Sequence, residues 1–398
     1  MNKGPIGAYA TADACQDDMA RGERFSAGKA ATPKRLLHVF PTFGYGGVPI
    51  RISNIINHFG DKYRHTLVAM DGCFDCRTRI KPEVRIEFIE TRASRYGLLT
   101  NLMRFRAAIR GVSPDIMITY NWGAIEWGLA NNLSQISRHV HMESGFGVEE
   151  ADRHIPRRAI MRRFALKGAQ RVVVPSLTMK GIATRSWKLD PQSIEYIPNG
   201  VDCDRFAGPG PSGPCNWRPK SNGELVVGTV APLRKEKNLG RLITAFAQLD
   251  PKYRSLLVIV GEGPERDDLD VLASTLGISD RVVFGGHVEN VEDVLGSLDV
   301  FALSSDTEQM PNSLLQAMAA GLPVAAVDVG DVKHILAPEN APYVVARDGG
   351  ALPEALAQLL EDPRLRRRLG QTNQAHVRRH YNEQRMFEAY ECLFESIL

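Results

Sequence analysis

The chain has 398 residues and a net charge of +3, with 43% hydrophobic and 24% charged residues, which is typical of a soluble globular protein with room for two domains. No apolar run approaches the roughly 20 residues that a membrane span needs, and residues 1–25 lack the apolar segment of a signal peptide. We therefore exclude a membrane-spanning protein and expect a cytoplasmic location.

The first half of the chain alternates apolar strands with amphipathic helices. Residues 1–32 are polar and lack periodicity, so they are expected to form a flexible leader. Strands are predicted at residues 35–40, 65–69, 85–88, 116–120, 138–142, 171–174 and 195–197, and helices at 48–59, 98–110, 124–133, 157–167 and 178–188. This alternation predicts a parallel, doubly wound sheet in a Rossmann-like domain over residues 33–205.

A second α/β series follows a stretch rich in proline and glycine. Residues 208–214 cannot continue a helix or a strand, so residues 206–222 are predicted to be a linker. Strands are predicted at residues 225–230, 256–260, 282–284, 300–303, 323–326 and 343–345, with helices starting at 239 and 313 and spanning 351–360, 363–380 and 383–397. We expect a second Rossmann-like domain over residues 223–380, facing the first across a cleft, and a C-terminal helix (381–398) that crosses back.

The charge is divided unevenly between these two parts. Residues 1–200 hold 29 Lys and Arg against 18 Asp and Glu, whereas residues 201–398 hold 20 against 28. This division predicts two domains with different partners, the basic one facing an anionic surface or acceptor.

The stretch from residue 300 to 324 joins an apolar strand to a helix whose start is well defined. Its loop carries Glu308, which could take sugar hydroxyls, and the free amides of the helix N-terminus could face phosphate oxygens. The residues that open this helix are Met310, Pro311, Asn312, Ser313 and Leu314. A capped surface helix without a ligand is an equally good interpretation of this stretch alone.

A second loop carries three cations just before a helix, at Arg234, Lys235 and Lys237. Cations at a helix N-terminus oppose the helix dipole and cost a few tenths of a kcal/mol unless an anion joins them. We therefore favour a diphosphate site over a solvated basic loop.

Three glycine-bearing turns also follow strands. Gly46 and Gly47 precede the helix at 48–59, where a tight turn and a phosphate or acceptor contact are equally consistent with the pattern. The turns at Gly261-Glu262 and at His287-Val288 lie near one sheet edge, where a nucleobase could bind, although either turn alone is ordinary.

Two patterns could suggest a metal site. Cys73 and Cys76 form the only CxxC pair, but no second pair follows, so we expect reduced cysteines. Asp202 and Asp204 form an Asp-x-Asp pattern after the turn at Asn199 and Gly200. Because two carboxylates alone are too few ligands for a metal site, we favour a turn between the two domains as the interpretation of this segment.

The predicted helix at 157–167 is basic and amphipathic. Its apolar and cationic residues are three and four apart, as in helices that lie on anionic membranes, and a solvated helix packed on the domain core is equally consistent with the pattern. The cations are Arg157, Arg158, Arg162, Arg163 and Lys167. Nearby, His141 lies in a predicted strand and could reach the cleft, although a strand histidine is more often structural.

Four motifs, in this order, resemble those of the family 4 retaining glycosyltransferases, which have the GT-B fold. They are Ile-Pro-Asn-Gly-Val-Asp at 197–202, Gly-Thr-Val with Leu-Arg-Lys-Glu-Lys-Asn within 228–238, Val-Gly-Glu-Gly-Pro-Glu-Arg at 260–266, and Glu-Gln-Met-Pro-Asn-Ser-Leu-Leu-Gln-Ala-Met-Ala-Ala-Gly at 308–321. The resemblance is specific over residues 170–330 and looser before them. It implies a first domain that binds the acceptor and a second that binds a nucleotide-sugar.

What the resemblance implies is a metal-independent hexosyl transfer, without a further cofactor, from a UDP- or GDP-sugar or a relative to a glycan or lipid-linked acceptor. The sugar would keep its anomeric configuration, and the product would belong to a cell-surface polysaccharide. Glu308 would lie near the donor sugar, Lys237 and Arg234 at the diphosphate, and Gln316 at the ribose. No nucleic acid partner is expected.

Three positions depart from the family's pattern. Gln316 stands where the family has a glutamate, which keeps hydrogen bonding and removes charge, Pro232 stands where it has an arginine, and Ser144 takes the place of a histidine. His141 would then stand in for that histidine in catalysis. The alternative reading is a catalytically degenerate GT-B protein that binds or scaffolds.

Overall fold

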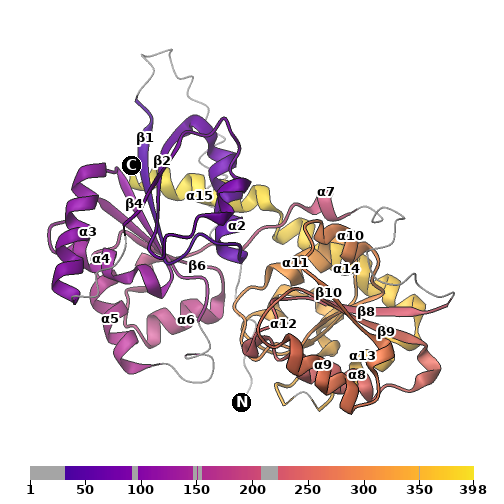
Figure 1. The fold of residues 1–398 in the computed structure, drawn as a ribbon. Coiled ribbons are helices and arrows are strands. Elements are labelled where there is room, and N and C mark those ends of the chain that lie inside the picture. Colours follow the sequence, from indigo (N-terminus) through magenta and orange to yellow (C-terminus); the bar gives the residue numbers. More distant parts are fainter. Residues whose placement is uncertain (1–31, 92–96, 147–149, 151–154, 208–222, 349) are drawn as a thin grey trace, which may run out of the picture.

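The computed structural model describes residues 32–91, 97–146, 150, 155–207, 223–348 and 350–398. Over these residues the chain forms two domains, each built on a parallel sheet (Figure 1). Nearly all of the expected leader and most of the expected linker lie outside these ranges. None of the helices in the described part is long and apolar enough to cross a membrane.

The first sheet has seven strands, in the spatial order β3-β2-β1-β4-β5-β6-β7. They are β1 (Lys34–Phe40), β2 (Tyr63–Ala69), β3 (Ile86–Ile89), β4 (Ile116–Tyr120), β5 (Arg138–Met142), β6 (Arg171–Val174) and β7 (Ile194–Tyr196). The helices between them are α2 (Gly47–Phe59), α3 (Leu98–Val112), α4 (Ile125–Asn132), α5 (Pro156–Leu166) and α6 (Leu177–Arg185). Every element predicted for this part is present, with ends that differ by a few residues.

The second sheet has six strands, in the order β10-β9-β8-β11-β12-β13. They are β8 (Leu225–Val230), β9 (Ser255–Val260), β10 (Val282–Gly286), β11 (Val300–Leu303), β12 (Val324–Val327) and β13 (Val344–Val345). Its helices are α8 (Leu239–Ala247), α9 (Arg266–Thr275), α10 (Val291–Gly296), α11 (Asn312–Ala319), α12 (Val332–Ile335), α13 (Leu352–Glu361) and α14 (Pro363–His380), and α7 (Cys203–Phe206) precedes the sheet. In both sheets the order reverses at the first strand, so the predicted fold class of two doubly wound, Rossmann-like domains is confirmed.

Four of the helices described with the second domain were not predicted: α7, α9, α10 and α12. Helix α9 buries only Leu269 and Ala273, and its first turn carries Asp267 and Asp268. Helices α10 and α12 span six and four residues, which is too short for a helical period to be recognised.

The last helix, α15 (Glu383–Ile397), packs on the first domain although it follows the second in sequence (Figure 1). Phe387 and Phe394 lie in the same buried cluster as Ile52 and Phe59 of α2. The ring of Phe387 stacks on His58 with centroids 4.2 Å apart. The core of the first domain is therefore completed by the end of the chain.

One expectation about the cysteines was wrong. Cys73, Cys76 and Cys203 are free thiols, but Cys392 on α15 is disulfide-bonded. The spacing of cysteines along the sequence carries no information about pairs that only the fold brings together.

The chain passes between the two domains twice, after β7 and before α15, and these two segments lie against each other at Gly200. The N–H of Val201 donates to Tyr381 O at 2.9 Å, and that of Glu383 donates to Val201 O at 3.0 Å. A Cβ atom on Gly200 would lie 2.5 Å from the Cα of Glu383, so only glycine allows this approach.

We expect Gly200→Ala to lower the free energy of unfolding by about 1–3 kcal/mol, because the start of α15 must move away from the first domain. Urea denaturation followed by circular dichroism measures this change. Gly111→Ala is the matched control, since Gly111 is helical and has open space around its Cβ position. The control should be neutral or slightly stabilising, and an equal loss in both variants would contradict the steric explanation.

Candidate functional site

A lysine and a glutamate meet where two loops leave neighbouring strands of the second sheet. Lys237 ends the 3₁₀ turn Lys235–Lys237 after β8, and Glu308 lies in the loop between β11 and α11. The Nζ of Lys237 lies 2.5 Å from Glu308 Oε1, and Ser305 Oγ donates to the same oxygen at 2.8 Å. The side chains of Lys237 and Glu308 are only 19% and 10% exposed, so this ion pair is largely removed from water.

A second ion pair, which the sequence analysis missed, holds these two loops together. Arg241 of α8 lies 2.7 Å from Asp306, and its guanidinium also donates to Ser304 O at 2.6 Å. Asn238 donates to the other oxygen of Asp306 at 3.0 Å. These bonds fix the backbone on both sides of the Lys237–Glu308 pair.

Glycine at position 330 lets a third loop approach Glu308. Its φ is +56°, and a Cβ there would lie 1.9 Å from the carbonyl oxygen of Glu308. Any side chain at this position would displace the loop that carries the carboxylate.

The start of α11 faces the first domain. Asn199, just after β7, donates from Nδ2 to Met310 O and to Asn312 Oδ1, both at 2.9 Å. Asn312 in turn donates to Gly47 O at 3.4 Å. The structure therefore brings the glycine turn, the Asn199 corner and the helix start together.

The other residues at this helix start differ in what they can offer a ligand. Pro311 is buried at the N-cap, Ser313 is half-buried, and Leu314 is fully buried. The N–H of Leu314 already donates to Pro311 O at 3.2 Å, so this predicted phosphate donor is occupied.

Two further contacts join the domains beside Glu308. Ser176, the N-cap of α6, donates to Gln309 Oε1 at 2.8 Å. Asp331 accepts the N–H groups of Leu177 and Thr178 at 2.6 and 3.0 Å. A carboxylate at a helix N-terminus is stabilised by the helix dipole, so these contacts favour the observed closeness of the domains.

Arg51, another residue that the sequence analysis missed, lies behind the Asn199 corner. It is buried in α2 and donates to Asn199 Oδ1 and, at 2.8 Å, to Ser144 Oγ. The signal that could have revealed it is an arginine four and eight positions before Ile55 and Phe59, on the helix face that packs on the core.

The predicted catalytic residue His141 is fully buried in β5. Its Nδ1 lies 2.8 Å from Thr119 Oγ1, and its Nε2 lies 3.6 Å from Glu143, which is itself paired with Arg162. These partners all belong to the interior of the first domain. The structure therefore does not bring His141 together with Lys237 and Glu308, and the placement gives its predicted catalytic role no support.

The predicted nucleoside residues lie at the β9–β10 edge of the second sheet. Gly261 has φ +138° and donates to Gly286 O at 2.8 Å, which joins the two turns. Glu262 and His287 are exposed, and the ring of His287 lies 6.5 Å from that of Tyr45 in the glycine turn. Val288 packs on the domain core instead.

The remaining predicted residues are less constrained. Arg234 is exposed, Gln316 is half-buried on α11, and Gly46 is the N-cap of α2. The N–H of Gly200 lies 3.2 Å from the sulfur of Met386 on α15.

The basic helix α5 differs from the prediction at Arg162. This side chain is 1% exposed, its Nε lies 3.1 Å from Glu143, and its terminal nitrogens lie 3.1 and 3.0 Å from Glu150. The rings of Trp122 and Trp187 lie 4.9 Å from its guanidinium carbon. Arg162 is therefore part of the core, because two carboxylates and flat aromatic faces replace its water.

No group of three or more His, Cys, Asp or Glu side chains in the described ranges could hold a metal ion. Asp202 instead caps α7 by accepting two backbone N–H groups at 3.1 Å. Asp204 pairs with Arg378 at 2.7 Å. Both carboxylates of the Asp-x-Asp thus have partners within the chain.

Comparison with known proteins gives matches along most of the chain. The family model described as Glycosyltransferase Family 4 matches residues 45–205, and that described as Glycosyl transferases group 1 matches residues 217–376. N-acetyl-alpha-D-glucosaminyl L-malate synthase of Bacillus anthracis is 29% identical over 180 residues, which are 45% of this chain and 47% of that protein. The lipopolysaccharide core biosynthesis glycosyltransferase LpsD of Rhizobium meliloti is 29% identical over 224 residues, 56% of this chain and 62% of that protein.

The chain thus spans less than two thirds of the length of either relative. Among solved structures, HepE of Anabaena in complex with UDP superimposes with a TM-score of 0.75, covering 91% of this chain and 100% of that chain. Its sequence is 16% identical, so this likeness is one of fold. With one family model on each domain and this shared architecture, the chain belongs to glycosyltransferase family 4 and has the GT-B fold.

Proposed function

We propose that the chain transfers a hexose from a nucleoside-diphosphate sugar to a glycan or lipid-linked acceptor, with retention of the anomeric configuration. The observation that carries this proposal is the Lys237–Glu308 pair, held beside the start of α11 and facing the first domain. Similarity to LpsD, named for lipopolysaccharide core biosynthesis, and to HepE, solved with UDP, supports a nucleotide-sugar donor and a cell-surface glycan product.

The pair supplies the two charges that this chemistry requires. The ammonium of Lys237, with Arg234 beside it, would stabilise the negative charge that develops on the departing diphosphate. The carboxylate of Glu308 would accept hydrogen bonds from donor-sugar hydroxyls and so orient the anomeric carbon. Without a donor, the two groups pair with each other, so each charge has a partner at low exposure.

No side chain of the protein is needed as a base for the acceptor. A donor phosphate oxygen can take the acceptor proton while the bond from the anomeric carbon to the diphosphate breaks and the bond to the acceptor oxygen forms on the same face of the sugar. The protein then has to orient the two substrates and stabilise the charge on the diphosphate. The nucleoside would lie at the turns of Gly261, Glu262 and His287, with Gln316 toward the ribose.

We expect Lys237→Ala to lower kcat about 10²–10³-fold, because the diphosphate loses its buried cation. Transfer from a panel of UDP- and GDP-sugars, read by mass spectrometry of products, measures the loss. Lys235→Ala removes an exposed cation from the same turn and should keep most activity. Wild-type activity in Lys237→Ala would contradict the assignment, and nucleotide binding without transfer for any acceptor would favour a degenerate binding protein.

We also propose that transfer needs no metal ion. The pairing of both Asp202 and Asp204 within the chain supports this. Treatment with EDTA, followed by the same transfer assay, should leave the rate unchanged. A rate that falls and is restored by magnesium or manganese would overturn the proposal.

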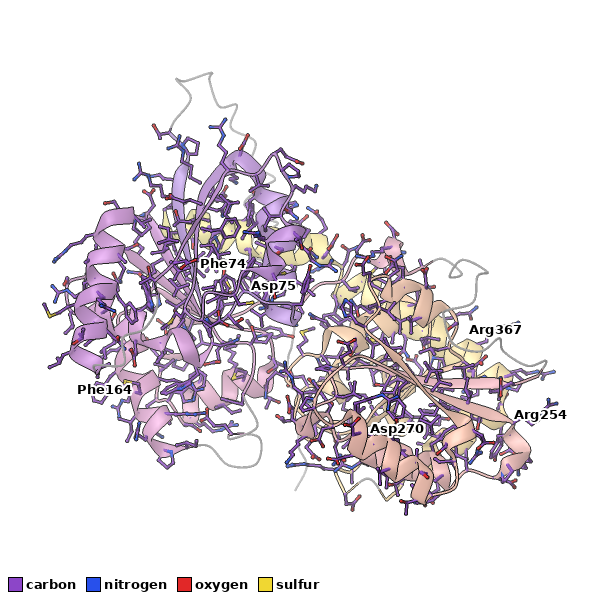
Figure 2. All side chains as sticks on the ribbon, in the orientation of Figure 1. Phe74, Asp75, Phe164, Arg254, Asp270 and Arg367 are labelled. Atoms are coloured by element: carbon purple, nitrogen blue, oxygen red, sulfur yellow. The ribbon has the colours of Figure 1, made fainter. Side chains whose placement is uncertain are left out.

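We further propose a peripheral location on an anionic membrane, through the outer face of α5. Ile160 and Phe164 are 57% and 62% exposed there, and Phe164 projects from the first domain in Figure 2. Arg157 and Arg163 are exposed cations on the same helix, and Lys167 is exposed at its C-cap. Apolar groups flanked by cations suit the interface of an anionic bilayer.

Each basic residue near an anionic surface contributes about 1 kcal/mol, so changing Arg157, Arg163 and Lys167 to Gln should weaken vesicle binding about a hundredfold at low salt. Sedimentation with phosphatidylserine-containing vesicles measures this. The matched control changes Arg254, Arg367 and Arg368 to Gln, which removes equal charge from exposed positions of the second domain, where Figure 2 labels Arg254 and Arg367. Equal weakening in both triple variants would show that net charge, not α5, sets the binding.

A further inference from the structure

Three loops meet at the edge of the first sheet where its strand order reverses. Strands β1 and β4 are neighbours, and the chain leaves them in opposite directions, to β2 and to β5. Ligands of doubly wound sheets bind at such a switch point, outside the carboxyl ends of the strands. A Cβ atom on Gly123, after β4, would lie 2.6 Å from the Cβ of Pro41, after β1, and one on Gly145, after β5, would lie 3.9 Å from Gln309 Cγ. This edge of the first domain therefore lies close to the loop that carries Glu308.

The first residue after β4, Asn121, has a strained backbone. Its φ is +55° and its ψ is −178°, a combination that residues other than glycine rarely adopt. Two hydrogen bonds hold it there: Asn121 N–H donates to Met142 O at 2.9 Å, and Ser144 N–H donates to Asn121 Oδ1 at 2.8 Å. Because a backbone N–H needs an oxygen acceptor, the second bond also fixes which way the side-chain amide points. The Nδ2 of Asn121 is left with no acceptor among the described residues.

The hydroxyl of Ser144 is oriented in a similar way. Its oxygen accepts a hydrogen bond from Arg51 Nη2 at 2.8 Å, so the hydroxyl hydrogen must point elsewhere. No acceptor for this hydrogen lies within the described part of the chain. Asn121 and Ser144 are both half-buried, so a ligand can reach them. Two neighbouring loops thus present two hydrogen-bond donors that the protein itself does not use.

Behind Ser144 lies a buried positive charge without a negative partner. Arg51 is 7% exposed, and none of the ion pairs between described residues involves it. Its guanidinium donates to two neutral oxygens, Asn199 Oδ1 and Ser144 Oγ, and its Nε–H has no acceptor in the same ranges. Arg162, by contrast, meets two carboxylates in the interior of the same domain. A guanidinium that is removed from water without a carboxylate is costly, so an anion bound nearby would stabilise it.

The carboxylates nearest to this place already have partners. Glu143 precedes Ser144 but pairs with Arg162, and Glu308 pairs with Lys237. Two donors and a positive charge therefore remain for a ligand. Carboxylate and phosphate oxygens accept hydrogen bonds and donate none, so they match this set. A neutral sugar hydroxyl would bring a further donor hydrogen and would leave the charge of the arginine unpaired.

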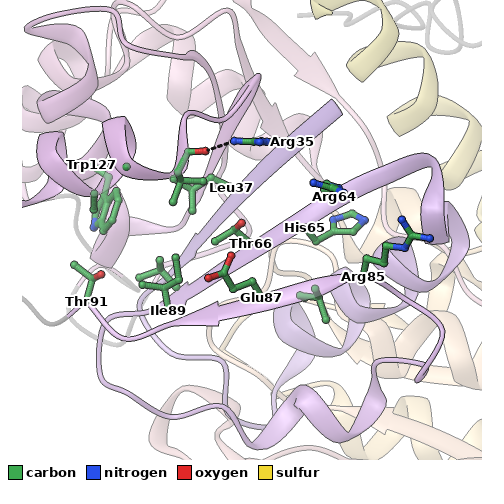
Figure 3. A pocket seen from close by; sticks show the side chains of 15 residues that line it. Arg35, Leu37, Arg64, His65, Thr66, Arg85, Glu87, Ile89, Thr91 and Trp127 are labelled. Carbon is green, nitrogen blue, oxygen red and sulfur yellow. Dashed lines mark hydrogen bonds between the residues drawn. The ribbon is translucent and has the colours of Figure 1, made fainter. Parts of the chain in front are cut away.

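The cavity drawn in Figure 3 is a different place in the same domain. It has a volume of about 690 Å³, lies on β1, β2 and β3, and shares no lining residue with the site formed by Asn121, Ser144 and Arg51. Its arginines are exposed, so water already solvates their charge, and the buried Trp127 and Val68 close its inner end. Only the buried arginine at the sheet edge combines an unpaired charge with unused donors.

We propose that the acceptor of the transfer carries a carboxylate or phosphate group, which binds Asn121 Nδ2 and Ser144 Oγ beside the charge of Arg51. This inference rests on the proposed glycosyl transfer and adds the chemical class of its second substrate. The anion belongs to the acceptor because Lys237, Arg234 and the turns proposed to hold the donor all lie in the second domain. Arg51 is a positioning residue, since it acts through the Ser144 hydroxyl and through its charge.

Saturation-transfer NMR of the full-length protein tests this inference with D-glucuronate, D-glucose 6-phosphate and neutral D-glucose as probes. At least one anionic probe should bind about tenfold more tightly than glucose. Ser144→Ala and Asn121→Gly should each raise the half-saturating concentration of that probe about tenfold, a loss of about 1.4 kcal/mol. Glycine is chosen at position 121 because it adopts the backbone conformation without strain and so preserves the loop. Arg51→Met should weaken binding of the anionic probe and leave that of glucose unchanged.

Two further variants serve as controls. Ser53→Ala removes a buried hydroxyl from α2, where Ser53 Oγ donates to Pro49 O at 2.9 Å, and should leave the titration unchanged. Lys237→Ala should also leave it unchanged, which distinguishes this site from the diphosphate site. Glucose that binds as tightly as both anions, a wild-type titration in Ser144→Ala and Asn121→Gly, or an equal loss in Ser53→Ala or Lys237→Ala would each overturn the inference.

The failure of this inference can be told apart from failure of the proposed function. A protein that transfers sugar, but whose Ser144→Ala and Asn121→Gly variants bind the anionic probes as the wild type does, would overturn the inference alone. A protein that transfers no sugar from any donor would overturn the proposed function and with it the role of the anion in an acceptor. UDP-glucuronate that binds more tightly than UDP-glucose, with the difference lost in Ser144→Ala, would place the anion on the donor sugar and overturn the assignment to the acceptor.

Discussion

The rest of the site depends on the ion pair between Lys237 and Glu308, which is largely removed from water. Each of Lys237 and Glu308 has the other as its charge partner at low exposure, and their contact requires two loops to be held at one distance. The Arg241–Asp306 pair supplies that constraint from one side, and the missing side chain of Gly330 allows it from the other. The surrounding bonds thus hold the two opposite charges where the proposed donor, which carries both phosphate and hydroxyl groups, would bind.

The first domain contributes to this arrangement through polar contacts and buried charges. Asn199 bridges the domains because Arg51 holds its oxygen while its nitrogen reaches the start of α11. Asp331 and Gln309 reach in the opposite direction, to the N-terminus of α6. Because all of these are hydrogen bonds between loops and helix ends, they can be exchanged for bonds to a ligand at modest cost, which an apolar interface would not allow.

Much of the fold could be predicted from the sequence because strands buried on both faces appear as continuous apolar runs separated by amphipathic helices. Glu308 and Lys237 could each be proposed from their positions after strands, but they are 71 residues apart, and nothing local indicates their contact. Arg51, Arg241 and Asp306 were missed for the same reason, since their partners lie on other elements. Arg162 was misplaced because periodicity treats charged residues as exposed, whereas here Glu143 and Glu150 pair with it inside the domain.

The position of α15 has a consequence for how the protein is made. The buried cluster of the first domain joins Phe59 to Phe394, so its apolar face remains open to water until α15 has left the ribosome. The second domain, whose core is continuous in sequence except for α7, is then complete before the first. Such a long separation between contacting residues slows closure and exposes apolar surface during synthesis, which makes the N-terminal domain the part of the nascent chain most in need of a chaperone.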